Sequence, residues 1–185
     1  MRSLLILVLV GCLTLLGLSQ GVPQYRPKAG ETVLKVTVEG RGTFYIKLHV
    51  KEAPRTTTHI QNLASQGFYD NQRVFRAEKT PRPFMIQLGD PNTKNKSLDD
   101  PTIGSGGSGA KIAYEDSGKF NDEGAVGLAA IPGDKNTGDS QFYILLGRAR
   151  FLDGNYTVFG QVVDGMDIVK KIERGDRITS ISVIK

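Results

Sequence analysis

Hydrophobic and polar residues alternate in two neighbouring segments that follow the first thirty residues. Leu34, Val36 and Val38 point to one side if their segment is extended, and polar residues separate them. The same alternation returns from 44 to 50, and residues 40–42 between the segments are Gly-Arg-Gly, a turn sequence. The pattern predicts an antiparallel β-hairpin with one buried face.

Two other segments have the spacing of amphipathic helices. Pro54 suits the first position of a helix, where a missing N–H is tolerated, and Ile60 and Leu63 then fall on one face. Gly67 suits the left-handed residue that follows a helix end. A second helix is expected over 165–172, where apolar residues recur at helical spacing.

Between these helices the chain has short apolar runs separated by glycine-rich loops. The runs that suit strands are 84–86, 125–128, 142–146 and 157–159, and a last strand is expected over 177–184. Several short strands with turn signals between them favour a closed antiparallel sheet over βαβ units. We therefore expect a mainly β fold, a closed antiparallel β-barrel with one helix covering each end.

The first residues differ in character from the rest. A positively charged start precedes an uncharged apolar run from Leu4 to Leu18, and small residues close it, as in a secretory signal. The run is shorter than the ~20 residues that a membrane-spanning helix needs. We expect residues 1–21 to be a removed signal peptide, 22–30 a linker and 31–185 one domain of an exported protein, either periplasmic or secreted.

Cys12, the only cysteine, lies inside the expected signal. The sequence Leu-Val-Gly-Cys at 9–12 resembles a lipobox, so a lipoprotein acylated at Cys12 is the alternative, and the one way in which membrane attachment is expected. A mature chain without cysteine has no disulfide and no thiol nucleophile. Export without disulfides fits a bacterial envelope better than an animal secretory route.

Charge and motifs exclude several function classes. The 24 basic and 19 acidic residues are scattered, without a basic block, so nucleic-acid binding is not expected. The only histidines, His49 and His59, are not at metal-ligand spacing from each other or from a carboxylate. Residues 104–111 lack the lysine position of a phosphate-binding loop, and there is no Gly-x-Ser-x-Gly motif. We expect no metal, no cofactor and no covalent nucleophile.

What remains is a set of aromatic, aliphatic and amide side chains around one arginine. The set is Arg76, Phe84, Met85, Gln87, Gln141, Tyr143, Phe151, Leu152 and Tyr156. The motifs that carry these residues are 53–56, 67–70, 75–76, 84–90, 104–107, 136–144, 151–154 and 158–160. In their order and approximate spacing they resemble the cyclophilin family of peptidyl-prolyl cis–trans isomerases, over about 33–185.

The resemblance implies an eight-stranded barrel with two helices, a monomer, proline-containing polypeptides as substrates and no cofactor. It implies that Arg76 is the catalytic arginine and that Gln87 orients it and contacts substrate. The residues implied to bind substrate are Phe84, Met85, Leu152 and Tyr143 in the proline pocket, Ala129 and Ala130 through their backbone, and Gln141, Phe151 and Tyr156.

The chemistry of such a site needs no acid–base pair. Rotation about a peptide bond has a barrier of ~18–20 kcal/mol because amide resonance is lost. X–Pro isomers are close in energy but exchange over roughly tens to hundreds of seconds. At the twisted transition state the prolyl nitrogen carries a lone pair, and a guanidinium that donates to it binds that state better than either planar one.

The chain departs from the family pattern at several places. Phe75 replaces the usual histidine, and the stretch 77–83 is about three residues longer than usual, which could shift Arg76. The loop 131–139 is also longer than usual by about two residues. Tyr156 stands where histidine is frequent. Phe151 replaces the tryptophan of cyclosporin-sensitive members, so one N–H donor is lost and weak cyclosporin binding is expected.

Three functions stay open at this point. The first is an active isomerase that assists the folding of exported proteins. The second is a peptide-binding or chaperone module with the cyclophilin fold and little turnover, which the insertion after Arg76 motivates. The third is a structural barrel domain of a larger assembly.

Overall fold

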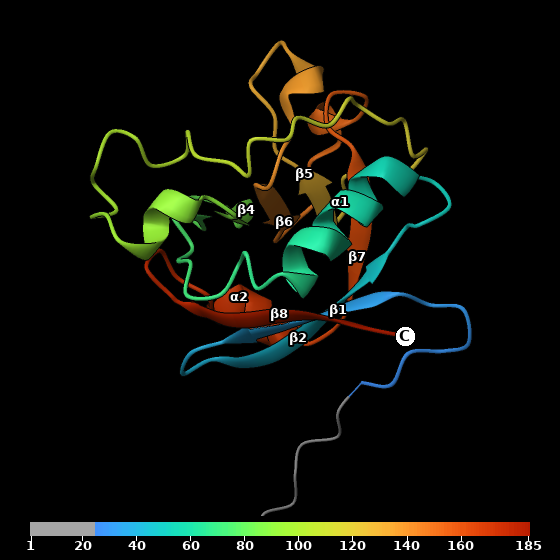
Figure 1. Cartoon of the computed structure of the whole chain (residues 1–185), viewed down its shortest axis with the longest axis horizontal. Coiled ribbons are helices and arrows are strands. Elements are labelled where there is room, and N and C mark those ends of the chain that lie inside the picture. The colour runs from blue at the N-terminus through green and yellow to red at the C-terminus, as the bar shows by residue number, and fades with distance from the viewer. Residues whose placement is uncertain (1–24) are drawn as a thin grey trace, which may run out of the picture.

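The computed structural model describes residues 25–185, which form one antiparallel sheet with two α-helices packed on it (Figure 1). The predicted hairpin is confirmed as β1 (Val33–Val38) and β2 (Gly42–Leu48), with Val36 opposite Phe44. Gly40 has a φ of 67°, a left-handed value that glycine adopts without strain, so it closes the turn between the two strands.

The other strands are β3 (Arg76–Glu78), β4 (Met85–Leu88), β5 (Ala125–Leu128), β6 (Phe142–Leu145), β7 (Val158–Asp164) and β8 (Ile178–Ile184). The helices are α1 (Pro54–Ser65) and α2 (Met166–Lys171), with short 3-10 turns at Pro91–Lys94, Lys135–Thr137 and Arg150–Leu152. The strands lie in the order β3-β4-β6-β5-β7-β2-β1-β8, and each neighbouring pair is antiparallel.

The prediction of a closed barrel is wrong, because the sheet is an open half-barrel. Its edge strands β3 and β8 share no ladder, and the segments before them form one isolated β-bridge, between Arg73 and Arg177. Asn71 and Gly175 have φ values of 64° and 103°, so neither segment can continue as an extended strand across the gap. A few loop hydrogen bonds, such as Val74 N–H to Asp176 O at 2.9 Å, tie the two edges together.

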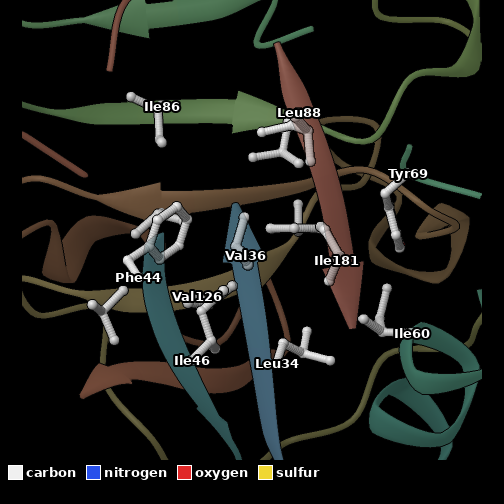
Figure 2. Close-up of a cluster of buried hydrophobic side chains, with 14 of the residues drawn as sticks. Leu34, Val36, Phe44, Ile46, Ile60, Tyr69, Ile86, Leu88, Val126 and Ile181 are labelled. Carbon is white, nitrogen blue, oxygen red and sulfur yellow. The ribbon is translucent and has the colours of Figure 1, made fainter. Parts of the chain in front are cut away.

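The main core fills the concave side of this sheet, and Figure 2 shows its centre. Its labelled members are Leu34, Val36, Phe44, Ile46, Ile60, Tyr69, Ile86, Leu88, Val126 and Ile181, all of them buried. They come from α1, from the turn after it, which holds Tyr69, and from strands that are far apart in the sequence. α1 packs against β8, while α2 packs against β2 and contributes Val169 to the same core.

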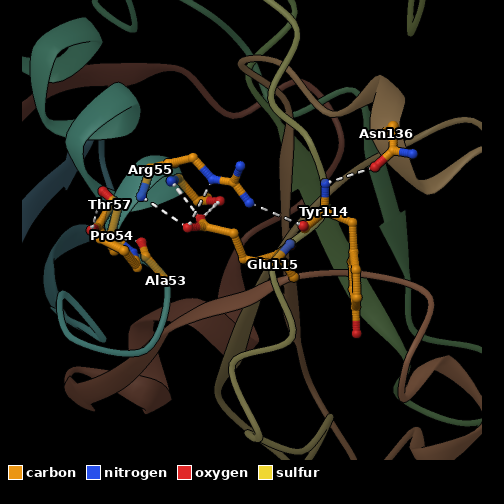
Figure 3. A network of polar contacts seen from close by, with 9 residues as sticks. Ala53, Pro54, Arg55, Thr57, Tyr114, Glu115 and Asn136 are labelled. Carbon is orange, nitrogen blue, oxygen red and sulfur yellow. Dashed lines mark hydrogen bonds and ion pairs between the residues drawn. The ribbon is translucent and has the colours of Figure 1, made fainter.

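A carboxylate from a distant loop holds the start of α1 (Figure 3). The residue before the helix, Ala53, has no side chain that could accept a bond from the first free N–H groups. Glu115 takes this role: it accepts from the backbone N–H of Arg55 (3.0 Å) and of Thr56 (2.8 Å), and from Thr56 Oγ1 (2.7 Å). Negative charge at this end also complements the helix dipole.

The far end of α1 matches the sequence prediction. Gly67 has a φ of 67°, and its N–H donates to Ala64 O at 3.1 Å. The N–H of Phe68 donates to Leu63 O, so the last carbonyl groups of the helix are satisfied by the turn that follows.

Glu115 makes the stability of the fold sensitive to acid. Burial alone would raise the pKa of Glu115, but the hydrogen bonds from Thr56 and Arg55 outweigh burial, and the pKa of the carboxyl lies below its usual value. A carboxyl with a lowered folded-state pKa stabilises the fold fully above its unfolded pKa of about 4.3. That contribution is lost as the pH falls through the folded-state pKa.

We predict that Glu115→Ala lowers the free energy of unfolding by about 1–3 kcal/mol at pH 7, because four donors of Arg55 and Thr56 lose their acceptor. The difference in free energy of unfolding between Glu115→Ala and the wild type should shrink as the pH falls from about 5 to about 3. Urea denaturation at a series of pH values measures it. The matched control is Glu123→Ala, which removes only a half-exposed ion pair with Lys170 and should cost about 0.5 kcal/mol or less. Equal losses of unfolding free energy in the two variants at pH 7 would contradict the conclusion that Glu115 stabilises the start of α1.

Candidate active site

The outer face of strands β3 to β6 carries the candidate site. Successive side chains of a strand point to opposite faces of a sheet. Ile86 and Ile144 point into the main core, so their neighbours Gln87 and Tyr143 point to the outer face. The apolar residues on that face form a second cluster, which is why these strands read as continuous apolar runs. The cluster comprises Met85, Ala125, Tyr143, Leu145, Ala149 and Val158, with Phe84, Leu152 and Tyr156 packed against it.

Strand register brings the key polar and aromatic residues into one row. Arg76 of β3 lies opposite Gln87 of β4, Gln87 lies opposite Tyr143 of β6, and Tyr143 lies opposite Gly127 of β5. Directly opposite residues on one face have Cβ atoms roughly 5 Å apart. The four residues therefore meet although the chain separates them widely.

A pocket of about 700 Å³ lies over this row. Its lining includes all eleven residues predicted as site residues: Arg76, Phe84, Met85, Gln87, Ala129, Ala130, Gln141, Tyr143, Phe151, Leu152 and Tyr156. The remaining lining residues are Gly104, Ser105, Gly106, Gly107, Lys111, Ile131, Pro132, Thr137 and Asp139. We call this the main pocket. One part of it is walled by aromatic and aliphatic side chains, and Arg76 and the two glutamines stand beside that part.

Arg76 is held on two sides. Its Nε donates to Glu78 Oε1 at 2.7 Å, its Nη2 lies 2.7 Å from the same oxygen, and its Nη1 donates to Gln87 Oε1 at 3.3 Å. The Cζ atom lies 6.0 Å from the centre of the Phe84 ring. Each terminal nitrogen has two N–H groups, and one on each is not used by these partners. The guanidinium thus stays oriented and keeps donors for a ligand.

The lengthened stretch after Arg76 does not move this residue out of the row. The N–H of Phe84 donates to Glu78 O at 2.9 Å, which closes the extra residues into a loop beside the strands. Lys79 in that loop forms an ion pair with Glu173, and none of residues 79–83 lines the main pocket. The possibility that the insertion displaces Arg76 is therefore not realised.

A chain of hydrogen bonds continues from Arg76 into the protein. Gln87 Nε2 donates to Gln141 Oε1 at 3.1 Å, and Gln141 Nε2 donates to the carbonyl oxygens of Gly104 (2.9 Å) and Gly106 (2.8 Å). The N–H groups of these two glycines donate to the buried carboxylate of Asp90. A side chain at Gly106 would place its Cβ 2.2 Å from Asp90 Oδ1, so this approach requires glycine.

Tyr143 forms the floor of the aromatic part. Its hydroxyl donates to Asn121 Oδ1 at 2.6 Å, and burial raises the pKa of Tyr143. Asn121 Nδ2 donates in turn to Asp153 Oδ1 at 2.9 Å. A Cβ at Gly127 would lie 2.2 Å from the Tyr143 hydroxyl, so glycine in the neighbouring strand makes room for the ring. Tyr156 meets the ring edge to face, with centroids 5.8 Å apart.

Phe151 stands at the rim of the pocket. Its side chain is 72% exposed, and its ring lies 5.7 Å from the ring of Phe84. Ala129 and Ala130 directly follow β5 on the other side of the pocket, and the N–H of Ala129 donates to Gln141 O at 2.9 Å. This bond holds the two alanines next to the end of β6.

Sequence reasoning missed Glu78 and Asp90. Glu78 lies two residues after Arg76 in the same strand, and such residues share a face, but a strand of three residues is too short to show an alternating pattern in the sequence. Asp90 acts through backbone groups of the 104–106 loop, for which the sequence carries no local signal.

Residues 25–185 contain neither a cluster of metal ligands nor a membrane-spanning helix. Within this range no three His, Cys, Asp or Glu side chains are grouped so as to hold a metal ion. No helix in the same range is long and apolar enough to cross a membrane.

The arrangement suits a ligand that is apolar at one end and offers a hydrogen-bond acceptor beside it. The aromatic and aliphatic walls can take up a small ring, and Arg76 can donate to an atom at its edge. Together with the two-helix, eight-stranded antiparallel sheet, this site defines the cyclophilin class of protein.

Comparison with known proteins supports this class. Residues 33–184 match the family model described as cyclophilin type peptidyl-prolyl cis-trans isomerase/CLD. The chain is 34% identical over 158 residues to peptidyl-prolyl cis-trans isomerase-like 1 of Neurospora crassa, which covers 78% of this chain and 86% of the relative. It is 32% identical over 139 residues to peptidyl-prolyl cis-trans isomerase CYP18-2 of Arabidopsis thaliana, covering 75% and 79% of the two chains.

The fold also matches a solved structure. A cyclophilin type peptidyl-prolyl cis-trans isomerase of Cryptosporidium parvum superposes with a TM-score of 0.69 at 22% identity, covering 84% of this chain and 98% of the other. The chain belongs to the cyclophilin-type peptidyl-prolyl cis–trans isomerase family, and its activity is peptidyl-prolyl cis–trans isomerisation. These relatives come from a fungus, a plant and a protist, so they give no support to the expected bacterial origin.

Proposed function

We propose that this isomerase accelerates rotation about X–Pro bonds by donating a hydrogen bond from Arg76 to the prolyl nitrogen at the twisted transition state. The observation that carries the proposal is the position of Arg76 at the edge of the apolar part of the main pocket. Gln87 and Glu78 hold the guanidinium there, with one free N–H group left on each terminal nitrogen.

The walls of the main pocket would bind the proline ring. Phe84, Met85, Leu152 and the ring of Tyr143 form an apolar seat in which a proline ring is fixed while the preceding carbonyl turns. Removing water from this seat strengthens the hydrogen bond from the guanidinium. No covalent bond is made or broken in this reaction, which is consistent with a site that offers orientation and one strong donor.

The residues around this seat would hold the rest of the peptide. Ala129 and Ala130 present backbone groups at the end of β5, and we assign them to the residue before proline by β-strand addition. Gln141, Phe151 and Tyr156 complete the contact surface of the main pocket. All these residues belong to one chain, and we propose that a monomer is the active form.

We predict that Arg76→Ala slows isomerisation of an Ala-Pro peptide at least about 100-fold, since loss of one transition-state donor typically costs 10²–10³ in rate. NMR exchange spectroscopy measures the interconversion directly. The matched control is Arg26→Ala, which removes an exposed arginine outside the main pocket and should leave the rate unchanged. If the wild-type protein binds the peptide but does not accelerate isomerisation of its Ala-Pro bond, the result would instead support a binding or chaperone module.

Cyclosporin should bind weakly. Position 151 holds a phenylalanine at the rim of the main pocket, which cannot donate a hydrogen bond, whereas tryptophan would carry an indole N–H there. We predict that Phe151→Trp tightens cyclosporin binding several-fold in a calorimetric titration. A nanomolar dissociation constant for the wild type would contradict this prediction.

We also propose that the protein acts on exported polypeptides, in a periplasm or outside the cell. The support is the signal-like pattern of residues 1–21, which lie outside the described residues. Mass spectrometry of the mature protein should find an N-terminus near residue 22. A mature chain that begins with an acylated Cys12 would identify a lipoprotein, and a chain that begins with Met1 would contradict export through a cleaved signal.

A further inference from the structure

A second groove lies beside the main pocket, between α1 and residues 111–113. Its volume is about 680 Å³, and it is lined by Pro54, Arg55, Thr58, His59, Asn62, Lys111, Ile112 and Ala113. Lys111 lines both the main pocket and this second groove, so the two hollows adjoin at this residue. The second groove is more open than the main pocket and has no part in the isomerisation step described above.

The second groove carries positive charge without a carboxylate in its lining. Arg55 contributes a guanidinium that is 62% exposed, although its Nε also lies 3.3 Å from Glu115. His59 is nearly buried, and its Nε2 lies 3.6 Å from Asp139 of the main pocket. Lys111 is exposed and has no ion pair with any carboxylate among residues 25–185. The uncompensated charge thus stands at the junction of the two hollows.

The ridge that carries Lys111 is fixed to the rim of the main pocket. The N–H of Ile112 donates to Gly138 O at 2.7 Å, and the two residues form an isolated β-bridge. Thr137 and Asp139, on either side of Gly138, line the main pocket. Lys111 therefore keeps its place at the edge of the substrate site and is not carried away by a free loop.

A bound peptide has a natural path across this ridge. If the residue before proline lies along Ala129 and Ala130, a chain that leaves the main pocket past Lys111 enters the second groove, because Lys111 lines both hollows. An extended chain rises about 3.3 Å per residue, so a few residues suffice to pass from one hollow into the next. The second groove lies where those residues would arrive.

We propose that the second groove binds the segment of substrate that precedes the proline by three to five residues, and that it favours acidic side chains there. Lys111 and Arg55 are the recognising groups. The inference rests on the proposed function, because it requires a peptide bound in the main pocket with the residue before proline at Ala129 and Ala130. It adds a preference for substrate charge that the isomerisation site alone does not have.

The test compares three peptides that share Ala-Ala-Pro-Phe and begin with Asp-Asp-Asp, Ser-Ser-Ser or Lys-Lys-Lys. Dissociation constants at pH 7.5 come from NMR titration of the full mature chain, and isomerisation rates come from exchange spectroscopy on the same samples. We expect the Asp peptide to bind about fivefold more tightly than the Lys peptide at low salt, as a few exposed ion pairs allow. The difference should shrink in 0.5 M salt, where charges are screened within a few ångströms.

Lys111→Glu should reverse the order in which the Asp and Lys peptides bind, so that the Lys peptide becomes the tighter ligand. The matched control is Lys35→Glu, which makes the same charge change in β1, outside both hollows, and should keep the wild-type order. Equal affinities of the wild type for all three peptides, or the same change in both variants, would overturn the proposal. If the wild type does not accelerate isomerisation of the Ser peptide, the result would instead count against the proposed function.

Discussion

The pairing register of β3, β4, β6 and β5 is the constraint on which the site depends. It places Arg76, Gln87 and Tyr143 side by side on the outer face, although loops of very different length separate them in the chain. A slip by one residue would turn each of these side chains to the other face. Ile86 and Ile144 prevent the slip, because their burial in the core is possible only in the observed register. The same packing therefore stabilises the fold and aligns the site.

The outer face of the sheet carries an apolar cluster, and Tyr143 in this cluster forms the floor of the main pocket. Tyr143 packs in an apolar cluster, where an unpaired hydroxyl would cost about 1–3 kcal/mol. Asn121 accepts its hydrogen bond, and Asp153 holds the amide of Asn121 in place. Gly127 leaves the space that the ring occupies. A tyrosine can stand here, where the family usually has phenylalanine, because three other residues accommodate its hydroxyl.

Much of this architecture could be predicted from the sequence because local signals carry it. Apolar runs mark the strands that are buried on both faces, and Pro54 and Gly67 mark the two ends of α1. Local signals could not show whether the sheet closes into a barrel, because closure depends on the backbone angles of a few loop residues such as Asn71. The resemblance to the family implied eleven site residues, and all of them line the main pocket.

The supporting residues were harder to find for a physical reason. Asp90 acts on the site through the N–H groups of Gly104 and Gly106, and backbone groups are the same in every sequence. Glu78 acts through strand geometry, since a three-residue strand is too short to show an alternating pattern. Residues of this kind become visible only when hydrogen bonds are traced outward from Arg76.

The charges around the main pocket divide into two kinds, and the division follows from their partners. Glu78 compensates the charge of Arg76 at 2.7 Å, so this guanidinium attracts a ligand weakly from a distance and acts chiefly through directed hydrogen bonds at contact. Lys111 has no such partner among the described residues and keeps its full charge at the rim. Because exposed charges are screened over about 8 Å at physiological salt, Lys111 acts mainly on the adjacent part of a peptide. We therefore assign orientation at the prolyl bond and attraction of the flanking segment to different side chains.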